Sequence, residues 1–211
     1  MSTSPATGQT LTLTLMNTKG GVGKTTSSVF LAAAFHAAGH TVQLWDADPQ
    51  GSLSEWLADA EDTWNTHHED PFPVAYDAVN RSSLNRRTPT AEILIIDTAP
   101  GDPSIQSAVA ARADLVIIPT EASRLDMSRV WVTVDALGPH VPSIVLLNRA
   151  NTRTRLHAEA VQALTEEGVP FFETTIARRE AFKQAAGTWP APNQLGPWAE
   201  ITTEIEEMIQ Q

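Results

Sequence analysis

The stretch at residues 17–26, which reads NTKGGVGKTT, constrains this chain more than any other feature. An apolar run at residues 11–16 precedes it, and an alanine-rich stretch at residues 25–38 follows it and ends at Gly39. Glycines in such a strand-to-helix turn allow successive backbone N–H groups to face one anion, and the N-terminus of the helix adds its dipole. The sequence therefore predicts a phosphate loop, a name we keep for residues 17–26.

The side chains of the phosphate loop indicate separate roles. Lys24 supplies a cation for the β and γ phosphates of a nucleotide, and the Thr25 hydroxyl is placed to hold Mg²⁺. The usual pattern has glycine where this chain has Thr18, and the chain carries an additional lysine, Lys19. Two alternatives are a glycine-rich turn without a ligand and a dinucleotide-binding turn. The dinucleotide-binding pattern needs a third glycine where this chain has Thr26, and it gives no role to a lysine inside the turn.

Carboxylates follow two further apolar runs. The run at residues 41–45 leads into Asp46 and Asp48, and the run at residues 93–96 ends at Asp97. Open parallel sheets bind ligands at the carboxyl ends of their strands, so these acids are expected beside the phosphate loop. An Asp-Pro turn without chemistry would explain Asp48 alone. All the strand ends together indicate chemistry on a magnesium-bound nucleotide.

The alternation of apolar runs with helical-period stretches predicts an α/β fold, a single P-loop NTPase domain with a mostly parallel twisted sheet and helices on both faces. Residues 1–10 are expected to form a disordered N-terminal tail, and the domain to cover residues 11–211. Residues 59–90 show no period, and we expect a surface excursion there with an edge strand near residues 74–76. The predicted strands are residues 11–16, 41–45, 93–96, 115–118, 144–147 and 171–174. The predicted helices are residues 25–38, 52–58, 104–111, 128–137, 154–167, 179–186 and 197–209.

Composition excludes several classes of protein. The chain has no cysteine, so it cannot hold disulfides, iron–sulfur clusters or thiolate-bound zinc. The N-terminus lacks the pattern of a signal peptide, and no apolar run reaches the roughly 18 residues of a membrane span, so we expect a cytoplasmic protein with no membrane partner. The net charge of −11 repels nucleic acid on average.

Four segments together resemble the ParA/MinD family of P-loop ATPases. These are KGGVGKTT at residues 19–26, DADPQG at 46–51, IIDTAPG at 95–101 and IPTEAS at 118–123. Asn148 and Arg149 resemble the adenine-side strand end of the family, and residues 176–182 resemble its arginine-bearing segment. Because only ten residues precede the first predicted strand, we expect no N-terminal helix-turn-helix domain. The chain is most similar to the small plasmid-type partition ATPases of this family.

The resemblance implies a slow Mg²⁺-dependent ATPase that cycles between ATP and ADP and forms a homodimer in the ATP state. Lys19 would cross the interface to the partner's phosphates, Asp97 would hold a metal-bound water, and Asp48 would place the attacking water. The implied catalytic residues are Lys19, Lys24, Asp48 and Asp97, and the implied metal residues are Thr25, Asp46 and Asp97. The implied nucleotide-binding residues are Lys19, Gly20, Gly21, Val22, Gly23, Lys24, Thr25, Thr26, Asn148 and Arg149.

The resemblance also implies partners: nonspecific DNA of the nucleoid and a ParB-like centromere-binding protein that stimulates hydrolysis. Basic residues cluster between residues 149 and 183, where we expect the DNA-binding surface. The candidates are Arg153, Arg155, Arg178, Arg179 and Lys183, with Arg149. The alternative is a solvated helix face on which these residues pair with Glu159, Glu166, Glu167 and Glu180.

Rival functions share some of these motifs. A membrane-cycling ATPase of the MinD type needs a basic amphipathic helix at its end, whereas this chain ends in AEITTEIEEMIQQ. A P-loop synthetase of the dethiobiotin type is disfavoured by the DPQG segment and the arginine-rich segment. A scaffold that binds ATP with little turnover stays open, as does another kind of spatial-positioning ATPase.

Overall fold

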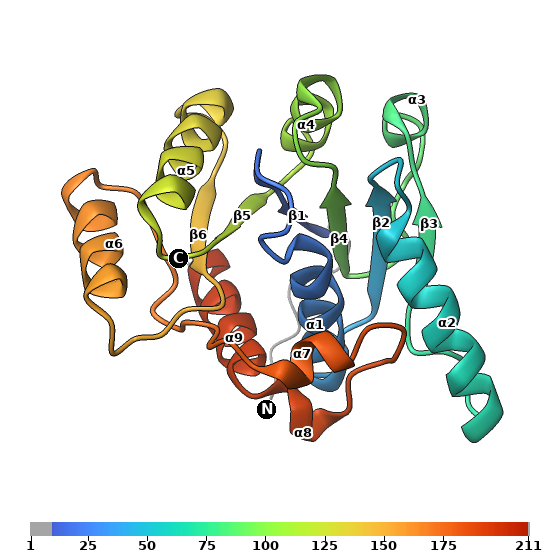
Figure 1. Ribbon diagram of the computed structural model, residues 1–211. Coiled ribbons are helices and arrows are strands. Elements are labelled where there is room, and N and C mark those ends of the chain that lie inside the picture. The colour runs from blue at the N-terminus through green and yellow to red at the C-terminus, as the bar shows by residue number, and fades with distance from the viewer. Residues whose placement is uncertain (1–9, 211) are drawn as a thin grey trace.

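Six parallel strands form one sheet in the order β3-β2-β4-β1-β5-β6 (Figure 1). This computed structural model describes residues 10–210, apart from the side chain of Lys183, so the predicted tail lies almost wholly outside the described residues. The strands are β1 Leu11–Leu15, β2 Val42–Ala47, β3 Ala75–Ala78, β4 Ile93–Thr98, β5 Leu115–Thr120 and β6 Ser143–Leu147. The predicted α/β class with a parallel sheet is confirmed.

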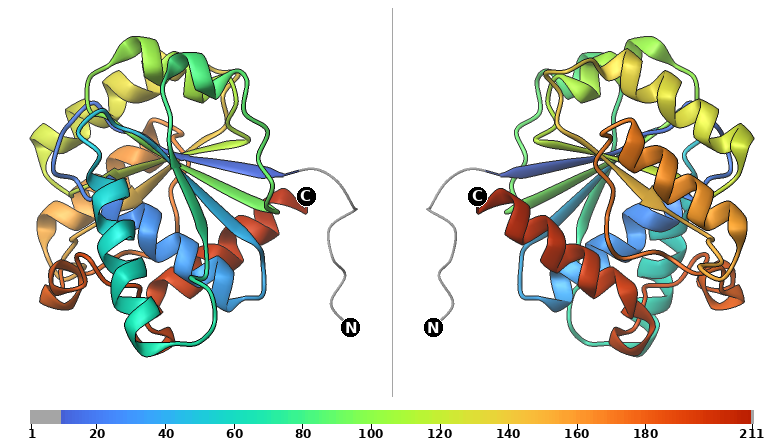
Figure 2. Two further views of the ribbon diagram at one scale, coloured as in Figure 1. Left: turned by 90° about the vertical axis from the view of Figure 1, so that its right-hand side faces the viewer. Right: turned by 90° about the vertical axis from the view of Figure 1, so that its left-hand side faces the viewer.

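Helices cover both faces of the sheet, as Figure 2 shows. One face packs against α1, α2 and α9, and the other packs against α3, α4 and α5. Every residue of β2 and of β4 is buried, because helices cover both sides of these strands. The helices are α1 Lys24–Ala37, α2 Ser52–His67, α3 Arg81–Leu84, α4 Pro103–Ala110, α5 Arg124–Leu137, α6 Arg155–Glu166, α7 Glu180–Gln184, α8 Pro192–Leu195 and α9 Pro197–Ile209.

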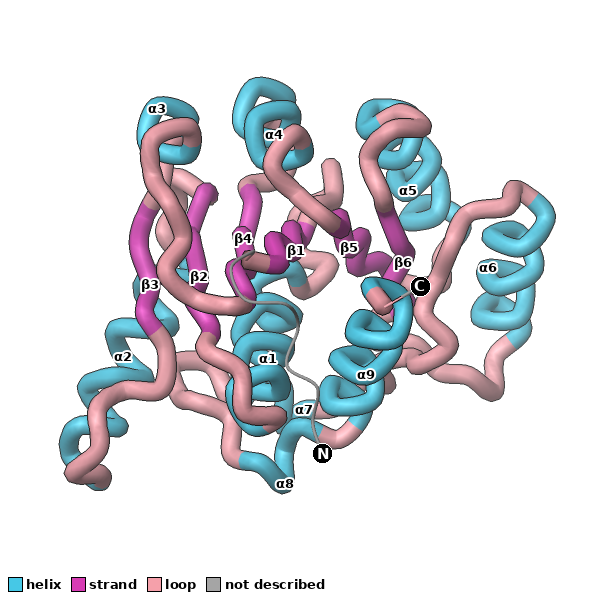
Figure 3. The backbone as a smooth tube through the Cα atoms, turned by 180° about the vertical axis from the view of Figure 1, so that it is seen from behind, coloured by secondary structure: helices cyan, strands magenta, loops and turns pink. Residues whose placement is uncertain are grey.

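The last helix, α9, is part of the hydrophobic core and lies along α1 (Figure 3). Its Trp198 is fully buried and stacks on Phe30 of α1, with ring centroids 5.7 Å apart. Ile201 and Ile205 follow at helical spacing on the same buried face. The apolar face of α9 is therefore occupied within the domain. Among the described residues, no helix is both long and apolar enough to span a bilayer.

The helix α2 is longer than predicted. Residues 59–67 continue it, because Leu57 and Ala60 are buried in register with Leu53 and extend its packed face. Its end is stabilised by Trp64, which stacks on His68 with ring centroids 3.8 Å apart. The edge strand predicted in this region is confirmed as β3, whereas the short helices α3 and α8 were not predicted.

The strand predicted at residues 171–174 is wrong. Phe171 forms only an isolated bridge to β6. The N–H groups of Glu173 and Thr174 each donate to the Glu204 carboxylate at 2.9 Å. Side-chain oxygens from α9 thus satisfy amides that a neighbouring strand would otherwise have paired.

Candidate nucleotide-binding site

The ends of β1, β4 and β2 bring the predicted acids next to the phosphate loop. In the sheet register Leu15 of β1 pairs with Asp97 of β4, and Asp97 pairs with Asp46 of β2. Since the strands are parallel, their carboxyl ends share one edge, and the phosphate loop leaves β1 at that edge. The predicted convergence of the loop with both carboxylate-bearing strands is therefore observed.

The start of α1 leaves its backbone donors without hydrogen-bond partners among the described residues. Its N-cap residue, Gly23, has φ of 91° and provides no side-chain cap. Within residues 10–210, no protein atom accepts a hydrogen bond from the backbone N–H groups of Gly23, Lys24, Thr25 or Thr26. Four free donors and the helix dipole at one point suit a phosphate group, so the loop passes a structural test for nucleotide binding.

Asn148 and Arg149 hold the phosphate loop from the end of β6. Asn148 Nδ2 donates to the carbonyl of Val22 at 2.9 Å, and Arg149 Nη1 donates to the carbonyl of Gly21 at 2.7 Å. A Cβ atom at Gly23 would lie 2.5 Å from Asn148 Nδ2, so only glycine fits there. The family resemblance assigned both residues to the adenine side, which stays a prediction, and the structure adds contacts that fix the loop backbone.

Lys24 lies beneath the loop with most of its side chain buried. Its amino group donates to the carbonyl of Lys19 at 3.4 Å. Burial lowers the pKa of Lys24, while the charges of Asp97 and Asp48 oppose that shift. An ammonium group that has lost much of its hydration gains strongly from a phosphate, as the predicted role of Lys24 requires.

Thr25 and Asp97 form the candidate magnesium pair. Thr25 Oγ1 donates to Asp97 Oδ2 at 2.6 Å, and Ser28 Oγ lies 3.3 Å from Asp97 Oδ1. A hydroxyl and one carboxylate, completed by phosphate oxygens and water, match the ligands that Mg²⁺ takes in nucleotide sites. No cluster of three or more acidic or histidine side chains among the described residues could hold a metal ion without a nucleotide. Ser28 was not predicted.

Burial raises the pKa of Asp97 to about 7, although hydrogen bonding by Thr25 and the charge of Lys24 lower it in part. The unfolded chain loses this proton near its ordinary value of 3.8. Between these values the folded state binds one proton more than the unfolded state, so stability falls as pH rises from about 4 to about 7.

We therefore expect Asp97→Asn to stabilise the metal-free protein at pH 8. A difference of about three pH units, at about 1.4 kcal/mol per unit, corresponds to at most about 4 kcal/mol. Thermal melts between pH 5 and pH 8 would measure the gain and the flatter pH dependence. Asp62→Asn, at an exposed position of α2, is the control and should leave both unchanged. Equal pH slopes in wild type and Asp97→Asn would contradict the assignment.

Asp46 and Asp48 have different surroundings. Both oxygens of Asp46 accept hydrogen bonds, one from the Asp48 N–H at 3.0 Å and the other from the Ser54 N–H and hydroxyl at 2.8 Å. Asp48 is half-buried and acts electrostatically on Lys24. Asp46 thus supports the turn that carries Asp48, and its place near the metal stays a prediction.

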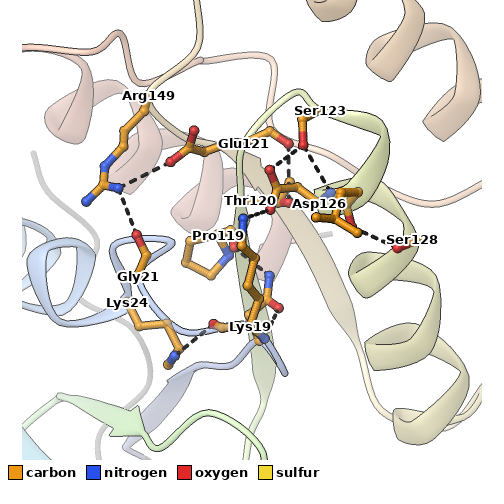
Figure 4. A network of polar contacts seen from close by, with 12 residues as sticks. Lys19, Gly21, Lys24, Pro119, Thr120, Glu121, Ser123, Asp126, Ser128 and Arg149 are labelled. Carbon is orange, nitrogen blue, oxygen red and sulfur yellow. Dashed lines mark hydrogen bonds and ion pairs between the residues drawn. The ribbon is translucent and has the colours of Figure 1, made fainter.

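Lys19 bonds within its own subunit in this structure. Its amino group forms an ion pair with Asp126 in the first turn of α5 (Figure 4). The Lys19 N–H donates to Asn17 Oδ1 at 2.8 Å, which holds the backbone there. Asp126 was not predicted, because no local pattern links it to a lysine more than a hundred residues earlier.

The predicted DNA-binding residues fall into two groups. Arg178 and Arg179 are exposed and line a cavity of about 30 Å³ beside Gly23 and Asn148. The second group lies at the start of α6, where Arg153 is exposed and Arg155 pairs with Glu159 at 2.7 Å. The side chain of Lys183 lies outside the described residues.

The site can now be compared with known proteins. The family model of the CobQ/CobB/MinD/ParA nucleotide-binding domain matches residues 13–188, which include the phosphate loop and all three strand ends. The chain belongs to the ParA/MinD family. It is therefore related to nucleotide-binding ATPases that partition or position cellular cargo.

One curated relative and two solved structures illustrate what the chain is similar to. The chain is 36% identical over 188 residues to the maintenance of carboxysome distribution protein A of Gloeobacter kilaueensis, covering 86% of this chain and 83% of the relative. The structure of apo McdA from Cyanothece has a TM-score of 0.74 at 20% identity, over 93% of this chain and 100% of that one. The structure of pNOB8 ParA bound to nonspecific DNA has a TM-score of 0.66 at 18% identity, over 96% and 99% of the two chains.

Proposed function

We propose that this protein is a positioning ATPase that dimerises on ATP, binds nonspecific DNA in that state and carries a cargo by slow hydrolysis. The observation that carries the proposal is the uncapped start of α1, which lies directly beside buried Lys24 and the Thr25–Asp97 pair. An anion site, a cation and a metal pair at one sheet edge suit a nucleoside triphosphate. Cyanothece McdA, a fold neighbour, has been solved as an ATP complex.

The residue roles follow from these positions. Backbone amides at residues 20–26 bind the phosphates, Lys24 compensates charge on the β and γ groups, and Thr25 and Asp97 hold Mg²⁺. Held by these residues, Mg²⁺ would supply positive charge beside the β and γ phosphates. Asp48 orients the attacking water, and Lys19 reaches the nucleotide of a second subunit. The family resemblance implies that intrinsic turnover is slow.

The cargo is a plasmid or chromosome bound through a ParB-like centromere-binding protein, as the motifs imply. The relatedness to carboxysome distribution proteins supports a second candidate, a cellular body such as a carboxysome. A MinD-like membrane cycle is disfavoured by α9, because its buried face packs on α1 and every charged residue in it is acidic, although Met208 and Ile209 are exposed at its end. Purified partner proteins tested for stimulation of ATP hydrolysis would distinguish these cargoes, and absence of turnover with DNA and any partner would favour the scaffold.

DNA binding is expected to need ATP. A monomer of net charge −11 offers only small basic clusters, whereas the two-fold symmetry of the ATP dimer would bring two copies of each cluster together. Retention on nonspecific DNA, measured with ATP, with ADP and without nucleotide over a series of salt concentrations, tests this. Tight binding by the nucleotide-free protein would contradict the proposal.

The basic residues are expected to contact DNA phosphates. Arg178→Ala and Arg179→Ala should each weaken binding on all sequences and lower the slope of log K against log salt by roughly 0.9 per lost contact. Arg86→Ala, an exposed arginine near the opposite edge of the sheet, is the control and should leave the slope unchanged. ATP affinity must be measured in the same variants. A loss of ATP affinity with an unchanged salt slope would assign these arginines to the nucleotide instead.

A further inference from the structure

The ion pair between Lys19 and Asp126 joins an accessible cation to a buried anion. The side chain of Lys19 is 37% exposed, whereas that of Asp126 is 5% exposed. Among the described residues, Lys19 is the one cation within ion-pairing distance of Asp126. Asp126 therefore depends on Lys19 for its counter-charge, while Lys19 could reach other anions from the surface.

The carboxylate of Asp126 is fixed independently of Lys19. Ser123 is the N-cap of α5, and its Oγ accepts a hydrogen bond from the Asp126 N–H at 3.1 Å. The same hydroxyl donates to the carboxylate oxygen that does not face Lys19. A negative charge in the first turn of a helix is also favoured by the helix dipole. The acceptor thus stays in place when the lysine moves.

The same connection between β5 and α5 contacts the phosphate loop at a second point (Figure 4). Glu121 accepts from Arg149 Nη1 at 3.2 Å, and that guanidinium also donates to the Gly21 carbonyl. Arg149 has φ of 49°, a left-handed conformation that a non-glycine residue adopts at some cost. This second contact keeps the connection beside the loop, so Asp126 faces Lys19 whether or not the two are paired.

We propose that Asp126 is a positioning residue that retains Lys19 within its own subunit and thereby opposes dimerisation. The inference rests on the proposed function, in which Lys19 must leave to reach the partner's nucleotide. Its departure leaves a buried carboxylate without a counter-charge, which costs free energy that dimerisation has to offset. Asp126 then sets the protein concentration at which the ATP dimer forms.

The ion pair itself can be tested in the nucleotide-free protein. Asp126→Asn keeps the shape and the contact with Ser123 but removes the charge. The rate at which an amine-reactive acetylating reagent modifies Lys19, followed by mass spectrometry, should rise severalfold in this variant. Asp135→Asn, an exposed site on the same helix, is the matched control and should react like wild type. Equal rates in all three proteins would overturn the proposal.

Dimerisation tests the consequence. With ATP, Asp126→Asn should dimerise at about tenfold lower protein concentration. A change of this size is larger than that expected from losing an exposed ion pair and smaller than that expected from losing a fully buried one. Asp126→Glu should restore much of the wild-type threshold, and Asp135→Asn should keep it. Analytical ultracentrifugation gives these thresholds. If wild type dimerises while Asp126→Asn does so equally or less well, the role of Asp126 is overturned. If wild type with ATP stays monomeric, the proposed function itself is contradicted.

Discussion

Lys24→Ala is expected to lower ATP affinity on the order of a hundredfold or more. Removing one partner of a buried charge pair typically costs about 2–5 kcal/mol of binding free energy, which corresponds to a loss of this size. The amino group of Lys24 lies within the phosphate loop, is mostly buried and has its pKa lowered by burial. Removing a poorly hydrated ammonium group should not destabilise the nucleotide-free fold. Isothermal titration calorimetry measures the affinity, and a thermal melt confirms that the variant is folded.

Lys19→Ala is the comparison for Lys24→Ala. Its amino group points to Asp126, away from the start of α1, so the variant should bind ATP measurably yet fail to dimerise or turn over. If Lys19→Ala instead lowered ATP affinity as much as Lys24→Ala does, both lysines would serve the nucleotide of their own subunit. The role of Lys19 across the interface would then be wrong.

Asp48→Ala is expected to reduce ATP turnover on the order of a hundredfold while leaving nucleotide binding intact, because misplacing a reacting group by a small distance costs about that much. Asp48 follows β2 at the sheet edge that carries the phosphate loop, and its charge acts on Lys24. The ATP dimer should consequently persist. Phosphate release measures turnover, and size-exclusion chromatography with ATP measures the lifetime of the dimer.

The Asp48 experiment needs a control for the turn. Asp48 Oδ1 accepts from the Gln50 N–H at 2.9 Å, so alanine also removes a local hydrogen bond. Asp48→Asn can keep that bond and removes the charge alone, and it should be as slow as the alanine variant. Glu55→Ala, an exposed acid in the first turn of α2, should turn over normally. Slow turnover in Asp48→Ala with normal turnover in Asp48→Asn would attribute the defect to the turn.

Local patterns sufficed for the sheet and the phosphate loop. Continuous apolar runs identified β4 and β5, since strands buried on both faces carry little else. The loop was readable because its glycines and lysine are contiguous in the chain. Patterns failed where burial came from distant segments: the second half of α2 has little period of its own, and the amides of Glu173 and Thr174 are satisfied by a helix thirty residues later.

The sequence by itself determined the fold class, the family and the side chains at the ends of β1, β2 and β4, because each depends on residues close together in the chain. The tertiary structure decided which of those side chains meet and what else they contact. It placed Lys19 on Asp126, Arg149 on the Gly21 carbonyl, and Arg178 and Arg179 beside Gly23 of the loop. These pairings join residues roughly a hundred or more positions apart in the chain. No periodicity or spacing of the sequence encodes them, because only packing of the complete sheet brings the ends of β5 and β6 against the loop that leaves β1.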